Sequence, residues 1–231
     1  MEIISETASK ANRDPKKIKL IVVTKSQSIE KIKVVIAAGA KFLGENYPEE
    51  TIQKFAHESE IENSIELHMI GHLQSRKSKV VVDHFNCLHS LDSLKLANRL
   101  NYQLAEVNKT LDVLLQFNVG GEDSKFGWDA CERNNWVGLV ENVQKIKEDC
   151  PKLNIVGLMT MPPLTSVESE ARNNFKKLVE LGSYFQEKIS GLKIYEYSMG
   201  TSIDYQYAIF EGATMVRIGS AIMGSRENLE V

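Results

Sequence analysis

Short runs of apolar residues alternate along the chain with longer stretches in which apolar positions recur every three or four residues. The short runs predict strands, because they are rich in β-branched residues and nearly continuous, as in parallel strands buried on both faces. Eight such runs are found, at Lys19–Thr24, Lys41–Leu43, Glu66–Ile70, Phe85–His89, Leu111–Asn118, Asn154–Met159, Lys193–Tyr197 and Thr214–Ile218.

The stretches between these runs carry the start and stop signals of helices. Ser28 and Asp92 are candidate N-terminal caps, and Gly39 is a stop signal. Proline residues bound the two longest stretches, since Pro151 follows one and Pro163 precedes the other. Helices are therefore predicted at Glu30–Ala38, Leu94–Val107, Asp129–Glu148 and Val167–Lys188.

Regular alternation of strand and helix over this length is typical of a (β/α)8 TIM barrel, and a doubly wound open sheet is the competing arrangement. We expect the barrel, with residues 1–231 forming a single domain, because no repeat, low-complexity tract or linker marks a second one. Residues 221–231 are too few for a full covering helix after the last strand. A helix within Ile3–Ala11 is expected to lie across that gap and complete the helical ring.

Charge and cysteine content narrow the class of protein further. A net charge of −3 gives no broad attraction to nucleic acid or to an anionic membrane. Cys87, Cys131 and Cys150 match no zinc spacing, so we expect reduced thiols in a cytoplasmic protein. The N-terminus lacks the features of a secretory signal, and no apolar run approaches the length of a membrane span.

Polar residues follow the predicted strands, and in a barrel the residues at the carboxyl ends of the strands form the active site. Lys25 is the most informative of them, because an amine at the end of an apolar strand is partly desolvated and can attack a carbonyl. The alternative is a lysine that marks where a strand meets water. The full set is Lys25, Glu45 with Asn46, Gly71 with His72, Ser90, Asn118, Thr160, Ser198, and 217–220.

Two loops near the C-terminus have the composition of a phosphate site. Ser198–Asp204 is a polar loop that enters a predicted helix, and Gly219 with Ser220 lies just beyond the last strand, where backbone amides can approach an anion. Ordinary turn and cap chemistry is the alternative. Arg217 lies within an apolar strand and needs either a carboxylate or the nitrogen of a ligand ring. A lysine for an aldehyde, a phosphate loop and this arginine together describe pyridoxal 5'-phosphate (PLP).

A series of short motifs in the sequence resembles those of a known protein family. They run in order over nearly the whole chain: Val23–Lys25 (VTK), Phe42–Tyr47 (FLGENY), His68–Ser75 (HMIGHLQS), Ser124–Gly127 (SKFG), Gly157–Thr160 (GLMT), Ser198–Gly200 (SMG) and Met215–Gly224 (MVRIGSAIMG). In these motifs the sequence resembles the pyridoxal phosphate homeostasis protein family, single-domain relatives of the alanine racemase barrel of fold type III.

The resemblance implies a role for each matching residue. Lys25 would hold PLP as an internal aldimine, Asn46 would approach the ring substituents near it, and Arg217 would face the pyridine nitrogen. The residues implied to hold or flank the phosphate are Ser198, Gly200, Ser202, Gly219 and Ser220.

The resemblance also implies a role in intracellular vitamin B6 homeostasis and amino-acid balance, with little or no catalysis. An arginine opposite the ring nitrogen keeps that nitrogen unprotonated, which weakens the ring as an electron sink. Racemisation needs a second acid or base, which the racemase relatives take from a tyrosine of an additional domain; here only Tyr47, Tyr197 and Tyr205 offer a substitute. Without that domain we expect a monomer that hands PLP to PLP-dependent apoenzymes.

Two enzyme classes remain as alternatives: a PLP-dependent racemase or other amino-acid-transforming enzyme, and a Schiff-base aldolase or phosphosugar isomerase. A metal site is not expected. His68, His72, His84 and His89 are spread over two strands and a helix with no thiol or carboxylate in a ligand pattern, which favours ordinary polar and packing roles.

Overall fold

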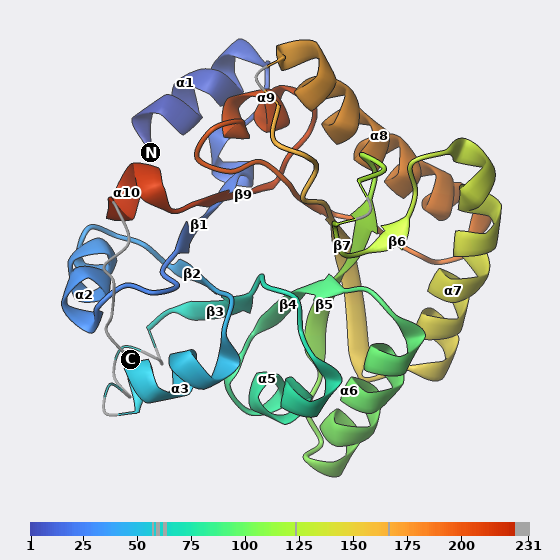
Figure 1. The fold of residues 1–231 in the computed structure, drawn as a ribbon, viewed down its shortest axis with the longest axis horizontal. Helices are drawn as coiled ribbons and strands as arrows, with labels where there is room; N and C mark the ends of the chain where they lie inside the picture. Colours follow the sequence, from blue (N-terminus) through green and yellow to red (C-terminus); the bar gives the residue numbers. More distant parts are fainter. Residues whose placement is uncertain (57, 59–60, 62–63, 123, 166, 225–231) are drawn as a thin grey trace.

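The computed structural model describes residues 1–231 except 57, 59–60, 62–63, 123, 166 and 225–231. Parallel strands form a closed barrel with helices around it (Figure 1). The barrel strands are β1 (Lys19–Val23), β2 (Phe42–Glu45), β3 (Glu66–Met69), β4 (Cys87–Leu91), β5 (Leu111–Asn118), β7 (Leu153–Met159), β8 (Glu196–Ser198) and β9 (Met215–Ile218). The two-residue strand β6 (Trp128–Asp129) pairs with β5 outside this circle.

Closure of the sheet decides between the two predicted architectures. The last strand β9 pairs with β1, and β4 pairs with β5, so each of the eight barrel strands has two neighbours and the barrel closes. The predicted (β/α)8 barrel is confirmed. Each observed strand agrees with its predicted run to within three residues at either end.

The largest shift among the strands concerns β8, which begins at Glu196 rather than at Lys193. The Ile194 amide donates to Gln186 Oε1 at 2.9 Å, so a side chain of the preceding helix holds this segment away from the sheet. Tyr195 N then donates to Val156 O at 2.9 Å, where the chain reaches β7.

Helices connect the strands on the outside of the barrel. They are α1 (Glu2–Lys10), α2 (Ile29–Ala37), α3 (Pro48–Phe55), α5 (Ser78–His84), α6 (Leu94–Glu106), α7 (Trp136–Asp149), α8 (Glu168–Lys188), α9 (Tyr205–Phe210) and α10 (Ser220–Met223). The predicted start of α6 at Leu94 was correct, but its predicted cap and the predicted start of α7 were wrong. Ser93, not Asp92, caps α6 by accepting the Leu96 amide, and α7 begins at Trp136 because Asp129 belongs to β6.

The N-terminal helix completes the helical ring, as the short C-terminal segment led us to expect. In Figure 1 α1 lies beside α9, and the two helices pack together. Arg13, just after α1, donates from Nη1 to the carbonyl of Ile209 in α9 at 2.7 Å. The helix α10 after β9 has a single turn, which is too short to cover the sheet by itself.

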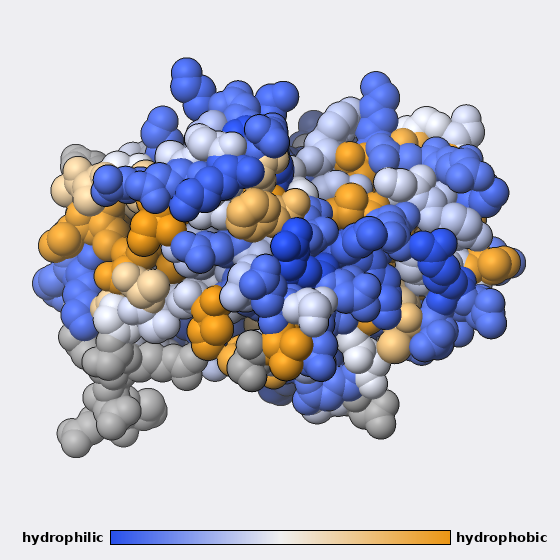
Figure 2. All heavy atoms as spheres, turned by 90° about the horizontal axis from the view of Figure 1, so that it is seen from above, coloured by the Kyte–Doolittle hydropathy of each residue, from blue (hydrophilic) through white to orange (hydrophobic). Residues whose placement is uncertain are grey.

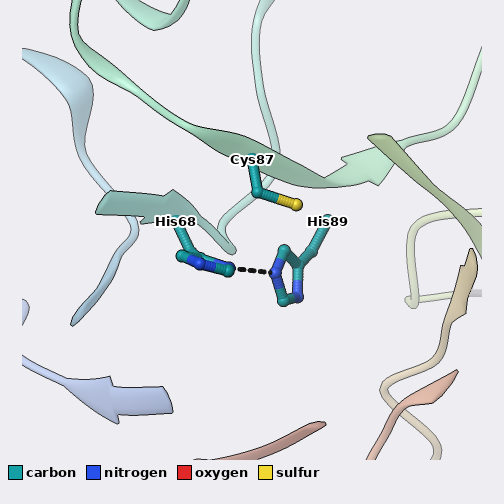
Figure 3. A group of neighbouring side chains, drawn as sticks. All are labelled: His68, Cys87 and His89. Carbon is teal, nitrogen blue, oxygen red and sulfur yellow. Dashed lines mark hydrogen bonds between the residues drawn. The ribbon is translucent and has the colours of Figure 1, made fainter. Parts of the chain in front are cut away.

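The interior of the barrel contains both apolar and polar side chains. Its apolar members come from alternate positions of the strands, as barrel geometry requires, and include Ile21, Leu114 and Met215. Polar groups lie among them. Figure 3 shows His68 of β3 and His89 of β4 with their rings turned toward each other inside this space.

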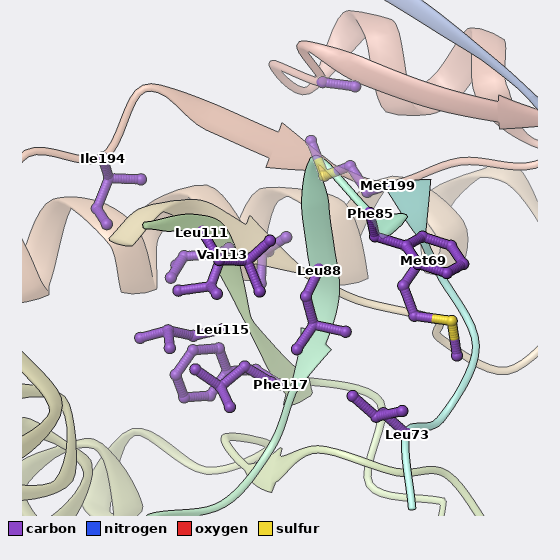
Figure 4. Close-up of a cluster of buried hydrophobic side chains, with 14 of the residues drawn as sticks. Met69, Leu73, Phe85, Leu88, Leu111, Val113, Leu115, Phe117, Ile194 and Met199 are labelled. Atoms are coloured by element: carbon purple, nitrogen blue, oxygen red, sulfur yellow. The ribbon is translucent and has the colours of Figure 1, made fainter. Parts of the chain in front are cut away.

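A larger apolar core lies between the strands and the surrounding helices. Figure 4 shows part of it, with Leu88, Val113 and Leu115 projecting from neighbouring strands β4 and β5. Burying such side chains stabilises the fold by about 1.5–3 kcal/mol each relative to exposure. This core fixes the strand positions, and through them the residues at both ends of the barrel.

The face that carries α1 and α9 is mainly polar. Figure 2, which looks onto the side of α1 and α9, shows a mostly hydrophilic face on which apolar side chains lie in separate groups. Within the described ranges, no helix combines the length and the apolar character that crossing a membrane requires.

Candidate functional site

A cavity of about 300 Å³ lies at the carboxyl ends of the strands. Its volume is at the lower end of the range for small-molecule sites, roughly 300–1,000 Å³. Apolar side chains such as Val23, Ile70 and Met223 form part of its wall, together with Gln27 and Met161. Six of the eight predicted site residues line it: Lys25, Asn46, Ser202, Arg217, Gly219 and Ser220.

Lys25 reaches this cavity from a turn at the end of β1. The strand ends at Val23, Thr24 is fully buried, and Lys25 follows as a half-buried residue of the cavity wall. Ser26 has a positive φ of 54°, which a non-glycine residue rarely adopts. Its amide donates to Glu50 Oε1 at 2.7 Å, so α3 holds the turn in this conformation. The backbone around Lys25 is therefore fixed by a neighbouring helix.

A buried ion pair supports the same turn from β2. Thr24 Oγ1 donates to Glu45 Oε1 at 2.7 Å, and Lys54 donates both to that oxygen at 2.8 Å and to the Thr24 carbonyl at 2.9 Å. The Lys54 and Glu45 side chains are 7% and 0% exposed. Burial raises the pKa of Glu45, although attraction to Lys54 counteracts the shift. Sequence reasoning singled out Glu45 only by its place after a strand, and missed this network.

Arg217 enters the cavity from β9 with neutral partners. Its Nη1 donates to Ser198 Oγ at 2.6 Å, and Nη2 donates to the Thr160 carbonyl at 2.9 Å and to Met161 Sδ at 2.9 Å. No carboxylate among the residues placed by the structure forms an ion pair with it, so the structural ion pair considered above is not observed. These three bonds use three of the five N–H donors of the guanidinium, so two donors are not used by them.

The charge of Arg217 is costly in this position. Burial lowers the pKa of its guanidinium to about 10, and attraction from Asp204 opposes that shift. The group therefore still carries its charge at neutral pH. A buried charge without an anionic partner favours a ligand that brings an acceptor to it.

Ser202 connects the loops after β8 and β9. Its Oγ accepts the Gly219 amide at 3.2 Å and the Ala221 amide at 3.4 Å. Asp204 occupies the N-cap position of α9, but its carboxylate bonds back to Thr201, accepting from the amide at 2.6 Å and from Oγ1 at 3.0 Å. The Asp204 side chain therefore does not cap the helix, and its two bonds to Thr201 fix the segment that carries Ser202.

Two predicted site residues, Ser198 and Gly200, do not line the cavity. Ser198 is fully buried behind Arg217 and accepts its hydrogen bond. Gly200 has a φ of +88°, and a Cβ there would meet Ala208 Cβ at 2.6 Å. Its carbonyl accepts the Arg217 amide at 3.0 Å. Both residues therefore contact Arg217 rather than the cavity.

Two amide oxygens at the cavity have no partner among the described residues. Asn46 Oδ1 and Gln27 Oε1 are buried and make no hydrogen bond, and both residues line the cavity. A buried acceptor left unpaired costs about 1–3 kcal/mol, so the site suits a ligand with a hydroxyl or another donor. Gln27 was not predicted, and its only signal in the sequence is its place two residues after Lys25.

The three tyrosines considered as a second acid or base lie elsewhere. Tyr47 is 52% exposed, Tyr197 packs against Gly182 of α8, and Tyr205 begins α9. None of them lines the cavity. Among the residues that the structure describes, the cavity wall therefore presents one amine and one guanidinium as its charged groups.

Comparison with known proteins places these features in a family. The family model described as alanine racemase, N-terminal domain, matches residues 5–227. The chain is similar to a pyridoxal phosphate homeostasis protein from Pasteurella multocida, with 35% identity over 224 residues that cover 97% of this chain and 93% of that protein.

Solved structures show the same likeness. PipY of Synechococcus elongatus, solved with PLP bound, has 31% identity and a TM-score of 0.79, and the match covers 96% of this chain and 100% of that one. An alanine racemase from Streptomyces coelicolor has only 16% identity, with a TM-score of 0.71 over 95% of this chain and 56% of that one. The second likeness concerns the fold alone.

Proposed function

The chain belongs to the pyridoxal phosphate homeostasis protein family, and on that premise we propose that it binds PLP in the cavity at the carboxyl ends of its strands. One observation carries this proposal: Lys25, Arg217 and the 219–220 segment, which come from opposite ends of the sequence, line a single cavity of about 300 Å³. The PLP-bound structure of PipY, which shares the fold over nearly its full length, supports it.

Lys25 is the proposed point of covalent attachment. When bound, PLP supplies an aldehyde that condenses reversibly with amines and a conjugated ring that can accept electrons. Lys25 offers the amine at the cavity wall, and the bonds of Thr24 and Ser26 to β2 and α3 fix the backbone that carries it. This fixed position lowers the entropy that attachment would cost.

Arg217 is proposed to meet the ring nitrogen. The guanidinium stays charged at neutral pH and has only donors to offer, so it favours an unprotonated nitrogen. Such a ring is a weak electron sink and suits storage better than carbanion chemistry. The unpaired oxygens of Asn46 and Gln27 suit a hydroxyl substituent on the same ring.

The phosphate is proposed to lie against Ser202, Gly219 and Ser220. All three line the cavity, and the hydroxyl oxygen of Ser202 accepts hydrogen bonds from two backbone amides there. A phosphate that reaches the same amides gains charge-assisted hydrogen bonds. Ser198 and Gly200 are proposed to act indirectly, through their bonds to Arg217.

This arrangement supports a role in holding and delivering PLP, and thereby in vitamin B6 homeostasis and amino-acid balance. PLP-dependent apoenzymes are the proposed recipients, and we expect a monomer that acts in the cytoplasm with little catalysis of its own. A PLP-dependent racemase is the second candidate, because the family model of the alanine racemase N-terminal domain matches residues 5–227.

The test is titration of the purified protein with PLP while the visible absorption of the lysine adduct is recorded. We expect saturation at one equivalent for the native protein and no saturable band for Lys25→Ala. Lys19→Ala, at the other end of β1, is the matched control and should behave like the native protein. Absence of any band would contradict the proposal. Efficient turnover of alanine or serine that disappears in Lys25→Ala would favour the racemase instead.

A further inference from the structure

A row of polar side chains runs through the interior of the barrel, behind the cavity described above. It begins at Arg217, whose Nη1 donates to Ser198 Oγ at 2.6 Å. Ser198 Oγ lies 2.8 Å from His89 Nδ1, and His89 Nε2 lies 2.8 Å from His68 Nδ1. His68 Nε2 faces the carboxylate of Glu66 at 3.7 Å. The row therefore extends toward the amino-terminal end of the barrel.

The donor-only character of arginine fixes the direction of the first bond in this row, in which Ser198 Oγ accepts from Arg217. Because Ser198 Oγ accepts from Arg217, its own hydroxyl proton is available for His89 Nδ1. When Ser198 donates in this way, a neutral His89 carries its proton on Nε2 and donates it to His68 Nδ1, 2.8 Å away.

Cys87 lies beside the two histidines. It is the register partner of His68 in the β3–β4 ladder, and His89 follows two residues later on the same face of β4. Figure 3 shows the three side chains converging, and their ligand atoms all lie within 4.8 Å of one another. The histidine spacing in the sequence gave no sign of this thiol, because the strand pairing brings it there.

We propose that His68 Nδ1, His89 Nε2 and Cys87 Sγ form a binding site for a thiophilic divalent cation of the zinc class. Two imidazoles and a thiolate are a ligand set that zinc prefers, with a water in the fourth position. Bond lengths of about 2.0–2.3 Å place tetrahedral ligand atoms about 3.3–3.6 Å apart, so the histidine nitrogens would separate by about 0.5 Å.

The surroundings meet two further requirements of a metal site. Metal-bound histidines donate their other N–H to a carboxylate or another acceptor, and here Ser198 Oγ lies 2.8 Å from His89 Nδ1. Glu66 lies 3.7 Å from His68 Nε2, which has no hydrogen-bond partner among the described residues, so this carboxylate would have to move closer. A cavity of about 260 Å³ at the amino-terminal end gives an ion a route to the ligands. Its lining includes His68, Cys87 and three carboxylates: Glu66, Asp112 and Glu196.

Binding would change the hydrogen bonds that lead to Arg217. The thiol of Cys87 releases one proton to solvent, and the proton on His89 Nε2 moves to Nδ1, so that both facing nitrogens are free for the ion. His89 then donates to Ser198, which reverses that bond while Arg217 still donates to the same oxygen. Binding of the ion therefore changes the hydrogen bonding of Ser198, which is a partner of Arg217. If the proposed function holds, this change also reaches the PLP ring.

The first test is titration of the purified apoprotein with cobalt(II), whose bond to a thiolate gives a strong near-ultraviolet band. We expect one equivalent to bind and the band to be absent in Cys87→Ser, with affinity weakened at least about tenfold. Cys131→Ser, which removes a thiol outside the barrel, should behave like the native protein. Thermal unfolding confirms that each variant folds. Equal cobalt affinity and spectra for native protein and Cys87→Ser would overturn the site.

The second test adds cobalt(II) to the PLP-loaded protein and follows the visible band of the cofactor. We expect a shift of that band in the native protein, no shift in Cys87→Ser, and a smaller shift in Ser198→Ala, which breaks the row. A native protein that binds cobalt without any change in the cofactor band would overturn the link to Arg217. Failure to load PLP would count against the proposed function, while the apoprotein titration would still decide the metal site.

Discussion

The two ends of this barrel hold cavities of similar size and opposite character. The cavity at the carboxyl ends, about 300 Å³, has Lys25 and Arg217 in its wall and no carboxylate from the described residues. The one at the amino ends, about 260 Å³, is lined by three carboxylates, Glu66, Asp112 and Glu196, and by one cation, Lys19. The first suits an anionic, acceptor-rich ligand and the second a cation. One set of alternating strands thus builds two sites whose charges complement different ligands.

Two lysine–glutamate pairs make the comparison quantitative. Lys54 and Glu45, near the carboxyl end, are 2.8 Å apart with side chains 7% and 0% exposed. Lys19 and Glu196, at the amino end, are also 2.8 Å apart but are 40% and 16% exposed. The two pairs therefore have the same length but differ in burial. Burial decides how much stability the protein loses when one partner is removed.

The largest effect is expected for Lys54→Met, which leaves Glu45 buried without its partner. The free energy of unfolding should fall by about 3–5 kcal/mol. Because the pKa of Glu45 is already raised in the folded state, the fold favours its protonated form, and stability is lost as the pH rises through that pKa. Urea unfolding should therefore show a greater loss at about pH 8 than at about pH 5.

The matched control for this prediction is the double variant Lys54→Met with Glu45→Gln. Removing the charge along with its partner should recover most of the lost stability and flatten the pH dependence. A Lys54→Met protein as stable as the native one at both pH values would show that the pair does not hold the Lys25 turn.

Arg217→Met should come next, with PLP binding weakened about 100-fold, equivalent to about 2.7 kcal/mol. The unfolding free energy of the apoprotein should change by less than about 2 kcal/mol, because relief of the buried charge offsets the loss of three hydrogen bonds. Fluorescence-detected PLP titration and urea unfolding measure the two quantities. Severe destabilisation with unchanged PLP affinity would make Arg217 a structural residue.

A smaller effect is expected for Ser202→Ala, which removes the hydroxyl between the loops after β8 and β9. PLP affinity should fall about fivefold, equivalent to about 1 kcal/mol. Affinity for pyridoxal, which has no phosphate, should stay the same. Parallel titrations with the two compounds check this, and an equal loss for both would place the phosphate elsewhere.

The smallest effect is expected at the amino-terminal pair. Lys19→Met should lower the unfolding free energy by no more than about 1 kcal/mol, because solvent screens this exposed pair. Added salt should shrink the difference further. Urea unfolding at low and high salt measures it. A loss as large as that of Lys54→Met would contradict the contrast between the two ends.

The sequence sufficed for the features that depend on periodicity and on position after a strand. Alternating apolar runs predicted the barrel, and the rule that sites form at carboxyl ends brought Lys25, Asn46 and Arg217 to one cavity. It could not show which residues hold the Lys25 turn, since Glu45 and Lys54 meet only through packing of β2, α3 and β1. Strand register likewise placed Cys87 beside His68, which no spacing rule predicts.

Ser198 and Gly200 were predicted from the sequence as cavity residues, but the structure places them elsewhere. Their loop composition suggested a phosphate contact, but strand direction turns Ser198 inward to Arg217, and the positive φ of Gly200 serves the turn. The composition of the loop identified a segment beside the cavity. It could not predict in which direction each side chain or backbone group of that loop points.

Borohydride reduction of the PLP-loaded protein, followed by peptide mapping, shows which amine holds the cofactor. Reduction makes the bond between cofactor and lysine permanent, so the labelled peptide identifies the amine that held it. The account predicts a single pyridoxyl label, on Lys25. A label on Lys54, or labels spread over surface lysines, would contradict it.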